Sequence, residues 1–155
     1  MPIPATSKSP SFRPRLLATG LAALLAAGCA SVPATTSAPE HAAALALLEQ
    51  GQAREAATRL EAQAQAASGA RREALLADAA FAWHEAGDAA RARSLLAQVD
   101  ARRVAGASRG RLALLGAELA IQDGRPAEAA AALAGGDPAT LPAALQPRWQ
   151  LARAA

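Results

Sequence analysis

The sequence predicts an all-α fold built as a solenoid of helical hairpins. Hydrophobic residues make up 52% of the chain but aromatic residues only 3%, and alanine, the best helix former, supplies much of the apolar content. β-branched and aromatic residues are too few for a sheet. Landmark residues also recur at spacings of 36 and 37 residues: Gly51, Gly87 and Gly124, and again Leu75, Leu112 and Trp149. A period in the mid-thirties is typical of stacked helical hairpins.

The start of the chain is predicted to be a signal peptide over residues 1–28. Residues 1–15 are polar and basic, and an uncharged run of 13 residues follows over 16–28. About 20 apolar residues are needed to span a bilayer, so this run is short for a membrane anchor and suits a signal-peptide core.

The run ends in Leu25-Ala26-Ala27-Gly28-Cys29, which resembles the lipobox of bacterial lipoproteins. The resemblance implies cleavage before Cys29, the only cysteine of the chain, and acylation of its thiol and new amino group. Several acyl chains make an effectively permanent anchor. Ala30 resembles the outer-membrane sorting pattern of Gram-negative lipoproteins. An ordinary secretory signal, cut at another small-residue site, is the alternative.

Residues 29–39 are predicted to be the lipidated cysteine and a flexible linker. The segment SVPATTSAP is uncharged and rich in Ser, Thr and Pro. A segment of this composition cannot form a hydrophobic core. We therefore expect it to be a tether between the lipid and a folded domain over 40–155.

The folded part begins with two hairpins. Residues 40–50 and 52–67 form the expected first pair, and residues 71–86 and 88–99 form the second. Gly51 and Gly87 supply left-handed stops that residues with a Cβ resist. Asp88 is a good N-cap for the helix that follows Gly87.

The third hairpin is expected after a connector over residues 100–110. Ser108 is a candidate N-cap for its first helix, which Gly124 stops. Pro126 opens the next helix, where a missing N–H costs nothing, and that helix ends at 135–136.

A last helix is expected over 148–153, opened by Pro147, with Trp149 in the register of Leu112 and Leu75. It reads as the first half of a fourth hairpin. Repeat arrays normally close with a polar cap, so we expect 40–155 to be a solenoid truncated in its fourth hairpin, the front of a longer protein. The alternative is that this helix is itself the cap.

Charge does not indicate a nucleic-acid partner, although the net charge is +3. Lys8, Arg13 and Arg15 lie in the first 28 residues, and 13 basic and 13 acidic residues remain without them. A nucleic-acid binder would keep its positive field in the folded part.

No motif indicates an enzyme, a metal site or a cofactor. The only histidines are His41 and His84, and the latter lacks a second histidine four residues on. No serine lies in a Gly-x-Ser-x-Gly setting. Trp83 and Trp149 are expected in the core. Arg102, Arg103, Arg109 and Arg111 are expected to form a basic patch, either a solvated connector or a contact for peptidoglycan or an acidic partner.

The Gly-Asp turn at 87–88, with small residues at Ala80 and Ala92, resembles a degenerate tetratricopeptide repeat. Lipobox, tether and the segments ALLADAAFAWHEAGDAARARSLLAQV, RLALLGAELAIQDGRPAEAAAALA and RWQLARAA together resemble the N-terminal part of LpoA-type penicillin-binding-protein activators. That family's second, larger domain, which is thought to make the main synthase contact, has no counterpart here.

The resemblance implies an outer-membrane lipoprotein that faces the periplasm and activates a class A penicillin-binding protein, a bifunctional peptidoglycan synthase. The alternative is a tetratricopeptide-repeat lipoprotein that serves outer-membrane assembly or pilus secretin insertion.

Overall fold

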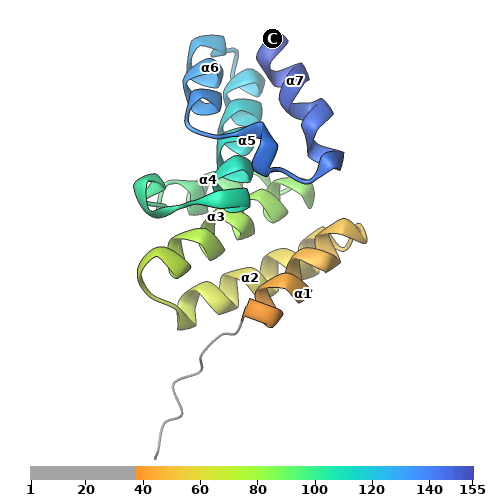
Figure 1. Cartoon of the computed structure of the whole chain (residues 1–155), viewed down its shortest axis with the longest axis vertical. Helices are drawn as coiled ribbons and strands as arrows, with labels where there is room; N and C mark the ends of the chain where they lie inside the picture. The colour runs from red at the N-terminus through yellow and green to blue at the C-terminus, as the bar shows by residue number, and fades with distance from the viewer. Residues whose placement is uncertain (1–37) are drawn as a thin grey trace, which may run out of the picture. The chain divides into compact units, whose positions relative to one another are not determined.

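The computed structural model describes residues 38–155, and this part of the chain is all-α, as predicted. The predicted signal peptide 1–28 and Cys29 lie outside the described residues. Within residues 38–155 there are seven α-helices, three short 3₁₀ helices and no strand (Figure 1). None of these helices is long and apolar enough to cross a membrane.

Six α-helices are joined in consecutive pairs and a seventh follows. The first pair is α1 (Ala38–Glu49) and α2 (Ala53–Ala66), and the second is α3 (Gly69–Glu85) and α4 (Ala89–Leu96). The 3₁₀ helix η1 (Ala101–Arg103) leads to the third pair, α5 (Gly106–Gln122) and α6 (Pro126–Ala134). Two more 3₁₀ helices, η2 (Pro138–Thr140) and η3 (Ala143–Leu145), precede α7 (Gln146–Ala154).

The turn inside each pair contains one of the three glycines that mark the repeat. Gly51, Gly87 and Gly124 have φ angles of 78°, 81° and 68°. L-residues with a Cβ resist this left-handed backbone, so glycine ends each first helix at this point. After Gly87, the Asp88 carboxylate accepts a hydrogen bond from the backbone N–H of Arg91 at 2.9 Å, which is the expected N-cap.

Several boundaries differ from the sequence prediction. Helix α1 begins at Ala38, so the last two residues of the predicted linker 29–39 are helical. Pro39 suits this place because the N–H of a first-turn residue has no partner inside the helix. Helix α5 begins at Gly106, whose φ is 57°. Ser108 therefore lies inside α5 and is not its cap, and the connector is shorter than 100–110.

The core combines alanine with larger side chains, mainly leucine, in about equal numbers. Leu75, Leu112 and Trp149, which are 37 residues apart, are 0%, 7% and 2% exposed on α3, α5 and α7. The Trp149 ring packs closely against the backbone after α6, where a Cβ on Gly136 would lie 2.9 Å from it. Small residues thus let large ones fill the space between helices.

The two helices of each pair pack on each other, α2 also packs on α3 and α6 on α7. In addition, α3 packs on α5, which in turn contacts α7. The first helices of successive pairs, α1, α3 and α5, together with α7, therefore form the series that carries the site described below (Figure 1).

Candidate functional site

The predicted patch of Arg102, Arg103, Arg109 and Arg111 is not present as a set, and the surface position predicted for Arg111 is wrong. Arg111 is buried, at 5% exposure. Arg109 donates hydrogen bonds to the backbone carbonyls of Ala101 and Gly135. Only Arg102 and Arg103 remain as exposed cations, with 91% and 61% of their side chains accessible. Both pair with Asp100, a residue that the sequence prediction left out of the patch.

Arg111 instead binds the buried carboxylate of Asp78. Its Nε lies 2.7 Å from Oδ1 of Asp78, whose exposure is 0%. The other oxygen, Oδ2, accepts a hydrogen bond from Ser108 Oγ at 2.8 Å and lies 2.7 Å from His41 Nε2. One carboxylate thus joins α1, α3 and α5.

Opposing effects set the charge of Asp78. Burial by itself would raise the pKa of its carboxyl, but the hydrogen bond from His41, the positive charge and hydrogen bond of Arg111 and the hydrogen bond from Ser108 together hold this pKa below its ordinary value of 3.8. Asp78 is therefore ionised at neutral pH, and its charge is compensated inside the protein.

Serine, histidine and aspartate meet at this point without forming a nucleophilic triad. In a triad the histidine contacts the serine hydroxyl and removes its proton. Here the Ser108 hydroxyl donates to Asp78, His41 contacts that same carboxylate, and Ser108 is only 7% exposed. The arrangement can hold helices together but cannot activate the hydroxyl.

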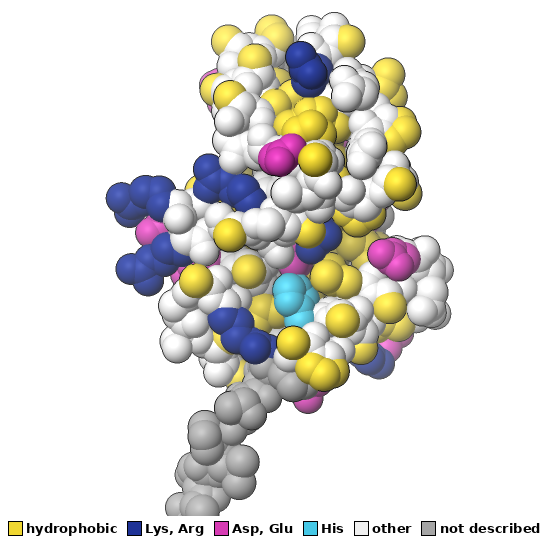
Figure 2. Space-filling model, viewed as in Figure 1, with side chains coloured by type: hydrophobic (Ala, Val, Ile, Leu, Met, Phe, Trp, Pro, Cys, Tyr) yellow, Lys and Arg dark blue, Asp and Glu magenta, His cyan; other side chains and the backbone are white. Residues whose placement is uncertain are grey.

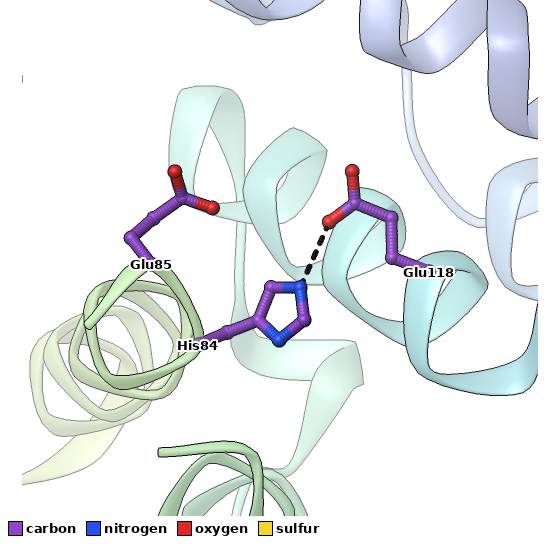
Figure 3. A group of neighbouring side chains, drawn as sticks. All are labelled: His84, Glu85 and Glu118. Carbon is purple, nitrogen blue, oxygen red and sulfur yellow. Dashed lines mark ion pairs between the residues drawn. The ribbon is translucent and has the colours of Figure 1, made fainter. Parts of the chain in front are cut away.

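A second cluster lies where α3 ends beside α5. Figure 3 shows His84, Glu85 and Glu118, which each offer a potential metal-ligating atom, all within 4.8 Å of one another. His84 Nε2 lies 3.2 Å from Oε2 of Glu118. Imidazole and carboxylate groups are ligands for zinc and similar ions, so this group is a candidate metal site that the search for a second histidine near His84 missed.

The position of a cation between these carboxylates is already taken by Arg148 of α7. Its guanidinium lies 2.9 and 2.8 Å from the Glu85 oxygens, and 2.9 and 2.7 Å from those of Glu118. A metal ion would have to displace this bidentate contact. The cluster is therefore best explained as an ion-pair junction that attaches α7 to α3 and α5.

The pKa values agree with that explanation. Burial would raise the pKa of the Glu118 carboxyl, yet the hydrogen bonds from His84 and Arg148 and the positive charge of Arg148 hold it below its ordinary value of 4.5. Burial would lower the pKa of Arg148, but its two glutamate partners raise it above the ordinary value. Both groups stay charged near neutral pH.

Trp83 lies in the core as expected, at 4% exposure, although its indole edge takes part in a polar contact. Its Nε1 donates to Glu61 at 3.0 Å, and Arg91 binds the same carboxylate while its guanidinium lies 4.3 Å from the ring centroid. The cation–π contact links α3 and α4, and the Glu61 carboxylate joins both to α2.

Sequence reasoning missed Asp78, although the sequence contains a signal for it. Asp78 is the one charged residue in the run LLADAAFAW, which is apolar on every side. A helix of that kind is buried all round, and a buried carboxylate requires a cation or several donors. That signal predicts a partner without saying that it is Arg111, 33 residues away.

Comparison with known proteins finds no matching family model, no similar curated protein and no similar solved structure.

The charged clusters at Asp78 and at Arg148 are used within the fold. What remains for interaction is the outer surface of the helices. Beside α7 there is an open hollow of about 490 Å³, lined by residues that include Ile121, Arg148 and Leu151. Leu151 is 72% exposed, a large apolar side chain that the described fold leaves uncovered.

Proposed function

We propose that this protein is a lipid-anchored interaction protein of the outer membrane, a tetratricopeptide-like helical solenoid that regulates peptidoglycan synthesis by binding and activating a class A penicillin-binding protein. The observation that carries the proposal is the repeat. Three helix pairs turn at Gly51, Gly87 and Gly124, and α7 places Trp149 in the register of Leu75 and Leu112. A repeat of this kind presents extended surfaces for a partner.

The chemistry of the described residues supports a binding role. The Ser108, Asp78 and His41 group is buried and holds three helices, and the glutamates beside His84 are engaged by Arg148. The anchor part of the proposal depends on Cys29 and the lipobox-like segment before it. We further propose that peptidoglycan itself is a contact of the anchored domain.

The anchor is tested by expressing the full chain with Cys29→Ala. We expect the wild type to incorporate a fatty-acid analogue and to fractionate with the outer membrane. The variant should lose the label and move to the soluble fraction. Unchanged labelling would refute the lipid anchor.

The partner is tested by affinity capture of class A synthases with the full chain, followed by an assay of glycan-strand polymerisation with and without it. Trp149→Ala and Leu151→Ala are a matched pair on the same helix, at 2% and 72% exposure. If activation depends on the folded repeat, Trp149→Ala should lose it. The free energy of unfolding of Leu151→Ala should stay at the wild-type value, so this variant is the folded control.

Capture of a secretin or of outer-membrane assembly proteins, with no effect on polymerisation, would replace this proposal by the alternative of an assembly scaffold. Contact with peptidoglycan is measured by co-sedimentation with purified cell-wall sacculi.

A further inference from the structure

The chain enters the fold at one end of the helix pairs. Helix α1 begins there, since Gln63 near the end of α2 donates a hydrogen bond to the backbone carbonyl of Glu40 at 3.1 Å. Helix α3 starts at the same end, because only a short turn separates it from α2. Arg71 and Arg72 lie in its first turn.

The 3₁₀ helix η1 brings two more arginines to this end. The Glu73 carboxylate accepts hydrogen bonds from Arg72 at 3.1 Å and from the backbone N–H of Asp100 at 2.8 Å, which fixes η1 beside the start of α3. Arg102 and Arg103 then project around Asp100. Figure 2 shows dark blue side chains gathered along one flank of this face. We call Arg71, Arg72, Arg102 and Arg103 the basic end.

The carboxylates nearby do not cancel this charge for an outside partner. Glu73 is 7% exposed and Asp100 presents 33% of its side chain, whereas Arg102 presents 91% and Arg103 presents 61%. The guanidinium groups therefore lie outside the carboxylates that they contact. Glu40, at the start of α1, also lies at this end, so the basic end carries a moderate excess of positive charge.

The described part as a whole holds equal numbers of basic and acidic residues. A domain with no net charge is attracted only weakly to a distant anionic surface, because its basic and acidic parts are pulled in opposite directions. Within about one Debye length, roughly 10 Å, a basic end on such a domain is drawn to the surface and so orients the domain.

The length of the tether brings such a surface within reach. Ala38 is nine residues after Cys29, and nine residues span at most about 30 Å when fully extended. An acyl anchor at Cys29 would therefore hold the start of α1, and the arginines at the same end, close to the lipid headgroups.

We propose that the basic end binds the anionic headgroups of phospholipids and orients the helix pairs on the membrane to which the chain is anchored. This inference depends on the lipid anchor of the proposed function, but it assigns a contact that the anchor alone does not require. Arginine donates two parallel hydrogen bonds to a phosphate, which suits it to this surface.

The test uses the full, lipidated chain reconstituted in vesicles that contain a headgroup-linked quencher. One thiol-reactive fluorophore is attached at Ala101→Cys, in η1, and in a second protein at Ala127→Cys, in the first turn of α6, away from the basic end. Vesicles of phosphatidylcholine alone are compared with vesicles that also contain phosphatidylglycerol.

We expect position 101 to be quenched at least about fivefold more than position 127 in the anionic vesicles. Fivefold is about the preference of a single arginine for an anionic membrane surface. High salt and phosphatidylcholine alone should reduce the difference to the level that the tether alone gives. Serine at all four positions of the basic end should reduce it to the same level.

A control variant with serine at Arg59, Arg93, Arg125 and Arg153, which loses the same charge elsewhere, should keep the difference. Circular dichroism checks that both variants are folded.

Equal quenching at the two positions in anionic vesicles would overturn the proposal, as would an undiminished difference in the basic-end variant. A change in the fluorescence at position 101 on addition of cell-wall sacculi, with no change on addition of anionic vesicles, would also overturn it. Failure of the anchor gives a different result: a free Cys29 thiol would take up a second fluorophore on each chain.

Discussion

Replacing Asp78 by asparagine tests whether one buried carboxylate joins three helices. The substitution keeps the size of the side chain and removes its charge. In the structure, Asp78 is inaccessible and Arg111 is 5% exposed, so the guanidinium would lose its counterion without gaining water. Removal of one partner from a buried ion pair costs about 3–5 kcal/mol.

That cost is large against the whole stability of a domain of this size, about 5–15 kcal/mol. We expect Asp78→Asn to lower the free energy of unfolding by about 3–5 kcal/mol, measured by urea denaturation at neutral pH and followed by circular dichroism. His41→Ala should cost only about 1 kcal/mol, because it removes one hydrogen bond from a side chain that is 24% exposed.

A double variant shows whether the cost comes from the unpaired charge. Replacing Asp78 and Arg111 together by leucine removes both charges, and such replacements of buried pairs are often neutral or stabilising. We expect the double variant to be more stable than Asp78→Asn. A loss below about 1 kcal/mol for Asp78→Asn, or an unfolded double variant, would refute the reasoning.

The same pair predicts a dependence on pH. The pKa of Asp78 is lower in the folded protein than the ordinary 3.8, so its contribution to stability is complete above that value and is lost as the pH falls below it. The difference in unfolding free energy between wild type and Asp78→Asn should therefore shrink below about pH 4. A difference that grows on acidification would contradict this assignment.

Three further substitutions test the turns, the core and the attachment of α7. Gly87→Ala should cost about 1–2 kcal/mol in unfolding free energy, because its φ of 81° strains any L-residue although no atom lies within 4 Å of the new Cβ. Trp149→Ala should cost about 3–5 kcal/mol, since the ring is 2% exposed. Arg148→Ala leaves Glu85 and Glu118 without their shared cation, and we expect faster hydrogen exchange of the α7 amides with little change in α1.

The local features of the fold could be predicted because they are encoded locally. A glycine that must adopt a positive φ is visible at Gly51, Gly87 and Gly124 without knowledge of the partner helices. The N-cap at Asp88 involves an amide only three residues away. The spacing of Leu75, Leu112 and Trp149 indicates buried positions because one period relates them.

The charged contacts could not be predicted because they join residues far apart in the chain. Arg111 lies among arginines in the sequence and was assigned to the surface with them, yet the fold brings it to Asp78, 33 residues away. Glu118 and Arg148 are 30 residues apart, and Glu85 and Arg148 are 63 apart. The sequence shows only that a buried charge needs a partner of opposite sign. The packing of the helices determines which two residues pair.

The repeat relates two of these ion pairs to each other. Arg111 and Arg148 are 37 residues apart, and each stands directly before a large buried residue of its helix, Leu112 or Trp149. Each reaches back to carboxylates on the preceding first helices, at Asp78 and at Glu118.

Helices rich in alanine bury little apolar area, and their smooth faces define the offset between neighbours weakly. If one helix slides along the next, the buried charges lose their partners. Each ion pair therefore disfavours a wrong offset between helices, even where it adds little net stability. The arginines therefore set the register between successive first helices, and alanine permits the close approach that brings them within reach.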